Sequence, residues 1–129
     1  MVQPKTEFRL RVFEDAIGGN QVNVVFDGNH NRLGHNMILN AEVLDGVQVL
    51  GEDCIVDHNQ ISKADRTGVF ISGNGASVRH NRFAELPVGI FKLSGVQGLE
   101  QTHNIFFDAA QEFIDPIPQA LPSPVPDQP

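Results

Sequence analysis

The chain has 129 residues, of which 40% are hydrophobic and 19% are charged, so it can form one domain with a packed core. Sixteen acidic residues outweigh nine Lys and Arg, and the formal charge of -7 argues against nucleic acid and against an anionic membrane surface as partners. The single cysteine, Cys54, cannot form an intramolecular disulfide, so packing must stabilise the fold.

No signal-peptide core and no run of about 18 apolar residues occur in the chain, so neither a signal peptide nor a membrane span is expected. A cytoplasmic location follows as the expectation. A fragment of a longer secreted or phage protein is the alternative.

Residues 1–21 precede the repeated part of the chain and are expected to cap its first copy. Within them, residues 7–17 alternate apolar and charged side chains, which is typical of a strand. Such a strand would place Phe8, Leu10 and Val12 over the first copy of the repeat. A short helix is the alternative for the same residues.

A repeat of about 22 residues occupies residues 22–115. Its first mark is the dipeptide His-Asn, which recurs at intervals of 23, 22 and 23 residues. Its second mark is a pair of alternating apolar residues that leads to a glycine. The His-Asn positions are His35-Asn36, His58-Asn59, His80-Asn81 and His103-Asn104. The second marks are Val24, Phe26, Gly28; Val47, Val49, Gly51; Val69, Ile71, Gly73; and Phe91, Leu93, Gly95.

Each copy contains short stretches of alternating apolar residues, which predict three strands per copy and no helix. A unit of this length cannot bury its own apolar face, so the copies must stack, with each strand pairing with its counterpart one coil away. The prediction is an all-β chain, a single-stranded right-handed parallel β-helix of about four 22-residue coils. The side chains expected inside it are Val47, Val49, Cys54, Val56, Ile61, Ala64, Val69, Ile71, Ala76, Val78, Phe83 and Leu86.

The pattern Val-x-His-Asn-x-Ile at residues 56–61, with Phe in the last position at residues 78–83, resembles the right-handed parallel β-helix repeat family. This family comprises the pectate-lyase-like solenoids, among them polysaccharide lyases, mannuronan epimerases and phage tailspikes. The resemblance implies the coil shape and leaves the chemistry open. The enzymes of this family usually carry acids and bases on the outer face of the first strand, where this chain has only Asp27 as an acid.

The four asparagines are expected to form a ladder at a tight turn, because Asn tolerates left-handed backbone angles and stacked amides can link their hydrogen bonds. The four histidines beside them are expected to stack as an outward column. Metal capture by the histidines is the alternative, although a linear column offers at most two imidazoles to one ion. The ladder is Asn36, Asn59, Asn81 and Asn104, and the column is His35, His58, His80 and His103.

The outward-facing residues include two apolar groups and several charged side chains. Val25, Leu50 and Phe70 are expected to form a continuous apolar strip, and such strips commonly mark protein contacts. A second apolar group, on the third strand of the copy, contains Met37 and Leu39 in one coil and Ile105 and Phe107 in another. Charges one coil apart are expected to pair as Asp57 with Arg79 and Lys63 with Glu85, whereas the acids Asp45, Glu52, Asp53 and Asp65 are interpreted as solvated turn residues.

The end of the chain is expected to close the stack. Phe113, Ile114 and Ile117 would form a final half-coil. Residues 116–129 are rich in proline, which favours an extended conformation and prevents strand pairing. This tail is interpreted as a block on the strand edge or as a disordered segment, with a stiff linker or a docking segment as alternatives.

Three functional hypotheses follow. The first is a noncatalytic module for protein assembly or ligand binding, with a homo-oligomer as the expected partner and a polysaccharide as the alternative ligand. The second, which rests on the family resemblance, is a carbohydrate-active enzyme or its remnant, of the lyase, epimerase or hydrolase type. The third is metal binding through the histidine column. No catalytic residue and no cofactor is predicted.

Overall fold

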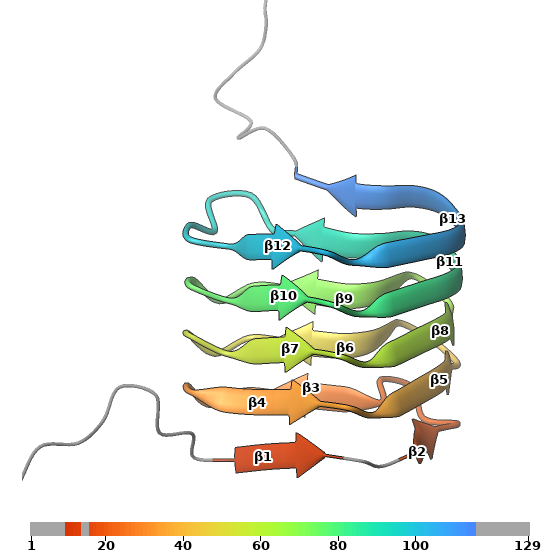
Figure 1. Cartoon of the computed structure of the whole chain (residues 1–129), viewed down its shortest axis with the longest axis horizontal. Coiled ribbons are helices and arrows are strands. Elements are labelled where there is room, and N and C mark those ends of the chain that lie inside the picture. Colours follow the sequence, from red (N-terminus) through yellow and green to blue (C-terminus); the bar gives the residue numbers. More distant parts are fainter. Residues whose placement is uncertain (1–9, 14–15, 116–129) are drawn as a thin grey trace, which may run out of the picture.

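The computed structural model describes residues 10–13 and 16–115 of the chain. These residues form 13 strands that pair in parallel, and none of them is helical. The strands wind into a solenoid of about four turns, with coils of about 23 residues stacked on one another (Figure 1). The predicted all-β parallel solenoid is confirmed. No helix within the described residues has the length and hydropathy needed to span a membrane.

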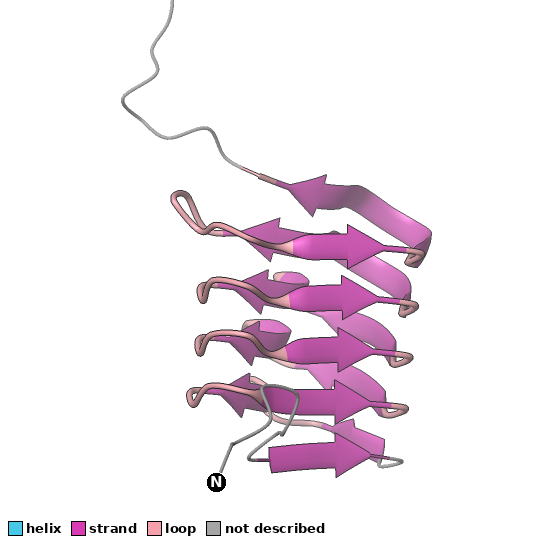
Figure 2. Cartoon of the chain, turned by 60° about the vertical axis from the view of Figure 1, so that its left-hand side comes forward, coloured by secondary structure: helices cyan, strands magenta, loops and turns pink. Residues whose placement is uncertain are grey.

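A complete coil presents three strands that lie on three faces of the stack, joined by short loops (Figure 2). The first face consists of β1 (Leu10–Phe13), β4 (Asn31–Gly34), β7 (Ile55–Asp57), β10 (Ser77–Arg79) and β12 (Glu100–Thr102). The second consists of β2 (Ala16–Gly18), β5 (Met37–Ala41), β8 (Gln60–Ala64) and the first parts of β11 (Arg82–Lys92) and β13 (Ile105–Ile114). The third consists of β3 (Val24–Phe26), β6 (Asp45–Val49), β9 (Thr67–Ile71) and the remaining parts of β11 and β13.

The corners of each coil are sharp because single residues adopt left-handed backbone angles there. Three columns of such residues follow the stack, and each column marks one corner. The columns are His35, His58, His80 and His103; Asn40, Lys63, Glu85 and Asp108; and His30, Asp53, Gly75 and Gly98. A reversal of direction within one residue allows each coil to close with few loop residues.

The core is a stack of apolar columns. All twelve side chains predicted to point inward are buried, and Val56 lies in register between Leu33 and Val78. Cys54 is also buried, and burial raises the pKa of its thiol. The prediction that Cys54 serves as a small apolar core residue agrees with this environment.

Phe91 and Leu93, the apolar pair of the fourth second mark, are expected to point inward as the pairs of the earlier copies do. This prediction is wrong by one residue. Ile90, instead of Phe91, pairs with Val69 and is fully buried, whereas Leu93 is 42% exposed. The cause is a shorter corner: residues 65–66 separate β8 from β9, but β11 passes through the same corner at Pro87 without interruption. This loss of a residue shifts the following positions on the third face, and the longer loop before β12 restores the register.

The shift places Lys92 in an inward column, where Ile71 precedes it. Its side chain is 15% exposed and reaches Asp115, with 3.0 Å between Nζ and Oδ1. Lys92 Nζ also donates to the carbonyl of Val96 at 2.8 Å. These groups line a hollow of about 340 Å³ at the last coil, with Phe113 on its wall. The positive charge is therefore neutralised where the apolar column ends.

Both ends of the stack agree in part with the expected caps. β1 pairs with β4, and Val12 packs against the core, so the predicted N-terminal strand is confirmed and the helix alternative is wrong. At the other end, Phe113 pairs with Ile90 and packs against the core, but Ile114 follows the outward column of Phe91. Phe8, Ile117 and the proline-rich residues 116–129 lie outside the described residues.

A pair of substitutions tests the coil assignment. Val56→Asp buries an unpaired charge between two apolar rungs, and we expect the variant to be unfolded at room temperature. Asp65→Ala removes an exposed turn carboxylate, and we expect the free energy of unfolding to change by less than about 0.5 kcal/mol. Thermal melting followed by circular dichroism measures both. Similar melting temperatures for the two variants would contradict the assignment.

Candidate functional site

The predicted asparagine ladder is confirmed at the corner between the first and second faces. The Nδ2 atoms of Asn36, Asn59 and Asn81 each donate to Oδ1 of the asparagine one coil further along, at 3.1, 3.0 and 3.0 Å. The backbone N–H of the same donor residue reaches the same oxygen at 2.9 Å in each case. Asn36, Asn59 and Asn81 are buried, so water cannot replace these bonds.

The ladder also connects to the strands behind it. Asn59 Nδ2 donates to the carbonyl of Leu33, and Asn81 Nδ2 donates to the carbonyl of Val56, both at 2.9 Å. Each buried amide therefore links three successive coils, and it fixes their register.

The physical reason predicted for the ladder is wrong in one respect. The left-handed backbone angle belongs to the histidine before each asparagine, with φ of 57°, 58°, 56° and 56° along the column. This reversal turns the histidine outward while the next residue points inward. Histidine is among the residues that adopt this conformation more readily than most.

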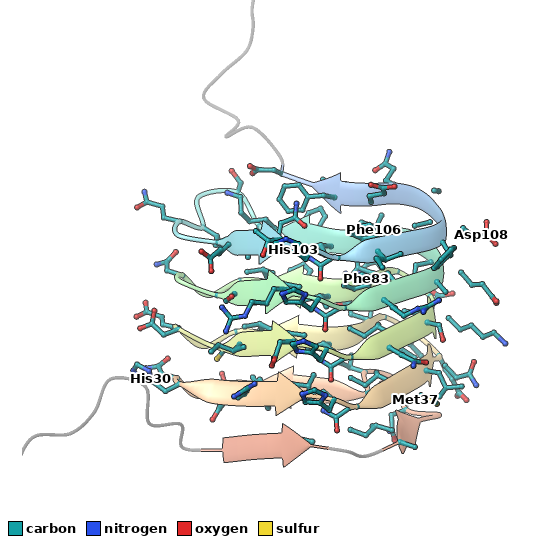
Figure 3. The ribbon with its side chains drawn as sticks, in the orientation of Figure 1. His30, Met37, Phe83, His103, Phe106 and Asp108 are labelled. Atoms are coloured by element: carbon teal, nitrogen blue, oxygen red, sulfur yellow. The ribbon has the colours of Figure 1, made fainter. Side chains whose placement is uncertain are left out.

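The four histidine rings form a parallel stack on the surface (Figure 3). Successive ring centroids lie 4.8, 4.9 and 4.8 Å apart, and the ring planes differ by 8°, 7° and 5°. The spacing equals the strand separation of a β-sheet, about 4.8 Å, because each ring is attached to the same position of successive coils. The fifth histidine, His30, lies away from this stack and approaches Asp53 at 4.0 Å (Figure 3).

A buried carboxylate lies against this column. Asp57 is 2% exposed and accepts a bidentate pair of hydrogen bonds from Arg32, at 3.0 Å from Nε and 2.9 Å from Nη2. His58 Nδ1 lies 2.9 Å from the same carboxylate. Burial alone would raise the pKa of Asp57, but the hydrogen bonds from Arg32 and His58 outweigh it and hold the pKa below its ordinary value. Asp57 is therefore ionised at neutral pH.

The charge pairs across the coils differ from the prediction at this point. Asp57 lies in register with Arg79, but its ion pair is with Arg32 of the preceding coil, and Arg79 Nη1 lies 3.9 Å from Glu100. The predicted pair of Lys63 and Glu85 is confirmed at 3.9 Å between exposed side chains.

His35, Asp57 and His58 together form a cluster of potential metal ligands. One ligand atom from each residue lies within 4.8 Å of the other two. The sequence prediction considered only pairs of imidazoles, although Asp57 directly precedes His58 in the sequence. The structure adds that this carboxylate is buried and oriented toward the column.

A second buried carboxylate was not predicted. Asp45 is fully buried, so its interpretation as a solvated turn acid is wrong. It accepts hydrogen bonds from Arg66, Gln48 and Thr67, including a 2.7 Å bond from the Thr67 hydroxyl. Burial would raise the pKa of Asp45, but the hydrogen bonds from Arg66, Gln48 and Thr67 together hold it below its ordinary value. The available signal was Thr67, which lies in register with Asp45 one coil away.

The apolar strip Val25, Leu50 and Phe70 is not continuous. Gln48 lies in register between Val25 and Phe70, and Leu50 belongs to the neighbouring outward column. A different set of apolar side chains is contiguous on this face. We call it the outer patch: Phe70, Phe91 and Ile114 in consecutive coils, flanked by Leu50 and Leu93.

Two observations describe the outer patch. The rings of Phe70 and Phe91 stack with centroids 5.5 Å apart. Leu50 and Leu93 are 37% and 42% exposed. The patch is thus an ordered apolar surface on the third face.

The second predicted apolar group is interrupted. Met37 and Ile105 occupy one outward column, at 48% and 50% exposure, but Gln60 and Arg82 lie between them. The Cζ of Arg82 lies 5.2 Å from the centroid of the Phe107 ring. The apolar residues of this group therefore form two separate clusters, one at each end of the second face, instead of a continuous apolar surface.

Comparison of the chain with protein-family models gives no match, and comparisons with curated proteins and with solved structures give no significant match. The arguments about function therefore depend on the geometry of the chain itself.

The buried carboxylates predict loss of stability in acid. Both Asp45 and Asp57 have pKa values below the ordinary 3.8 in the folded chain. Their contribution to the free energy of unfolding is therefore complete above about pH 4 and is lost as the pH falls through the folded-state values. We expect the melting temperature to fall steeply in this range. Asp45→Asn should start from a lower melting temperature and show a shallower fall.

Asp65→Asn, at an exposed carboxylate, is the control and should keep the wild-type profile. A series of thermal melts from about pH 6 to about pH 2.5 measures the effect. An Asp45→Asn profile that runs parallel to the wild-type profile would show that Asp45 does not carry the acid sensitivity.

Proposed function

We propose that the chain is a noncatalytic β-solenoid module for protein assembly, and that its outer patch binds a second copy of the chain. The observation that carries this proposal is the contiguity of Phe70, Phe91 and Ile114 on three successive coils. Rows of apolar side chains on a flat sheet lose unfavourable contact with water when a second surface covers them. A symmetric contact between two identical patches accomplishes this with one kind of chain.

The charge distribution supports this use of the third face. The chain carries a formal charge of -7, so two copies repel each other at most surfaces. The five members of the outer patch are uncharged. The nearby guanidinium of Arg66 lies 5.1 Å from the ring centroid of Phe70, and its charge is balanced by the bidentate pair with Asp45. The patch is therefore a surface at which two acidic copies can approach with less repulsion.

A carbohydrate-active enzyme of the parallel β-helix repeat family is the alternative function. Acid–base chemistry of this kind needs two carboxyl groups that can exchange protons across a substrate. Asp45 and Asp57 are the buried carboxylates of the described residues, and each is bound in a bidentate pair with an arginine. These two groups are ionised and engaged, which favours the noncatalytic proposal.

Light scattering coupled to size exclusion tests the assembly. We expect the wild-type chain to be a dimer or a larger oligomer, and Phe70→Glu and Leu93→Glu to shift it to a smaller species. The reason is that each variant places a carboxylate in the apolar contact. Gln60→Glu, at an exposed position on the second face, is the control and should keep the wild-type mass.

Circular dichroism spectra of all variants should match the wild-type spectrum, because the altered side chains point outward. A wild-type chain that is monomeric at high concentration would contradict the assembly proposal. In that case, binding of polysaccharides to the same face becomes the hypothesis to test.

A further inference from the structure

We propose that His35, His58 and Asp57 form a binding site for one divalent transition-metal ion, with Zn²⁺ as the expected occupant. The site lies on the corner between the first and second faces, and it is independent of the outer patch. Two imidazoles and one carboxylate with open positions are a ligand set that transition metals accept in proteins. One potential ligand atom of each residue already lies within 4.8 Å of the other two.

The residue before each histidine determines which part of the column can bind a cation. Along the stack these residues are Gly34, Asp57, Arg79 and Thr102, which pair in register. Among the described residues, Asp57 is therefore the one carboxylate that directly precedes a histidine of the column, and it lies within ligand distance of both His35 and His58. Arg79 instead places a positive charge beside His80, which disfavours a cation in the upper part of the column.

The carboxylate is well suited to this role because it is oriented in advance. The bidentate pair with Arg32 holds Asp57 in a single orientation, and Asp57 Oδ2 lies 2.9 Å from His58 Nδ1. Two ligand atoms at about 2.0–2.1 Å from one ion are separated by about 2.9–3.4 Å, depending on the angle. The separation of Asp57 Oδ2 and His58 Nδ1 therefore lies within this range, and a rotation of the His58 ring turns its nitrogen lone pair from the carboxylate toward the ion.

The imidazole of His35 must move further than that of His58 before both can bind one ion. The rings of His35 and His58 are parallel to within 8° and their centroids lie 4.8 Å apart, so their nitrogen lone pairs lie in nearly parallel planes and do not converge on one point between the rings. Binding requires one ring to tilt until the two nitrogens approach to about 3.3 Å. Both histidines are exposed, so a change of side-chain torsion leaves the apolar core undisturbed. The asparagine ladder meanwhile holds the two backbones in place.

The charge balance also permits an ion. Asp57 and Arg32 neutralise each other, and a carboxylate has about four lone-pair positions, of which Arg32 and His58 use three. When the ion binds His58 Nδ1, the proton of that nitrogen moves to Nε2, so the ring stays neutral. The bound ion then adds positive charge to a strongly acidic chain.

Isothermal titration of the full, metal-free chain with ZnCl₂ at pH 7.5 tests the site. We expect one ion per chain, and at least about a tenfold loss of affinity in His35→Asn and in His58→Asn. Asparagine is chosen because it tolerates the left-handed angles of these positions. His103→Asn is the matched control, with φ of 56° in the same column, and it should bind as the wild type does.

A titration with CoCl₂ gives a second measurement, because the visible absorption of Co²⁺ reports its coordination. We expect a spectrum typical of four or five ligands, which His58→Asn abolishes. The absence of saturable binding in the wild-type chain would overturn the proposal. Equal loss of affinity in His103→Asn would overturn it as well, because the ion would then bind along the whole column instead of at the carboxylate.

Discussion

The hydrogen bonds of the buried asparagine ladder are the interaction on which the rest of this structure depends. At Asn59 alone, the amide oxygen accepts from both Asn36 donors, and the amide nitrogen donates to Leu33 and Asn81. Each buried polar group left without its partner would cost about 1–3 kcal/mol, so the ladder permits very few alternative registers. Apolar columns alone would not prevent slippage, since neighbouring coils offer similar side chains to one another.

The ladder also determines where the surface groups lie. Because each asparagine points inward, the preceding histidine must reverse the backbone and point outward, and this produces the stacked imidazole column. The same fixed register places Asp57 beside His58, at a rung where a carboxylate and two imidazoles can meet. On the third face, it places Phe91 between Phe70 and Ile114. The proposed metal site and the outer patch both result from the register in which the coils stack.

Features that recur in every coil could be predicted from the sequence, whereas features of a single coil could not. The ladder and the inward residues such as Val56 and Val78 follow from patterns repeated four times. The corner at Pro87 is one residue shorter than in the preceding coils, and this displaced the predicted phase of Phe91. The pairing of Arg32 with Asp57 was missed because a repeat defines which residues are directly opposite, but a long arginine side chain reaches diagonally into the next coil.

Hydrogen exchange measured residue by residue with NMR tests the role of the ladder most directly. The backbone N–H groups of Asn36, Asn59 and Asn81 each donate to the asparagine side chain of the next coil. If the ladder fixes the register, these amides exchange only when the whole chain unfolds, with the same free energy as the most protected amides of β7 and β10. Exchange of the three asparagine amides through local opening, while the amides of β7 and β10 remain protected, would contradict this account.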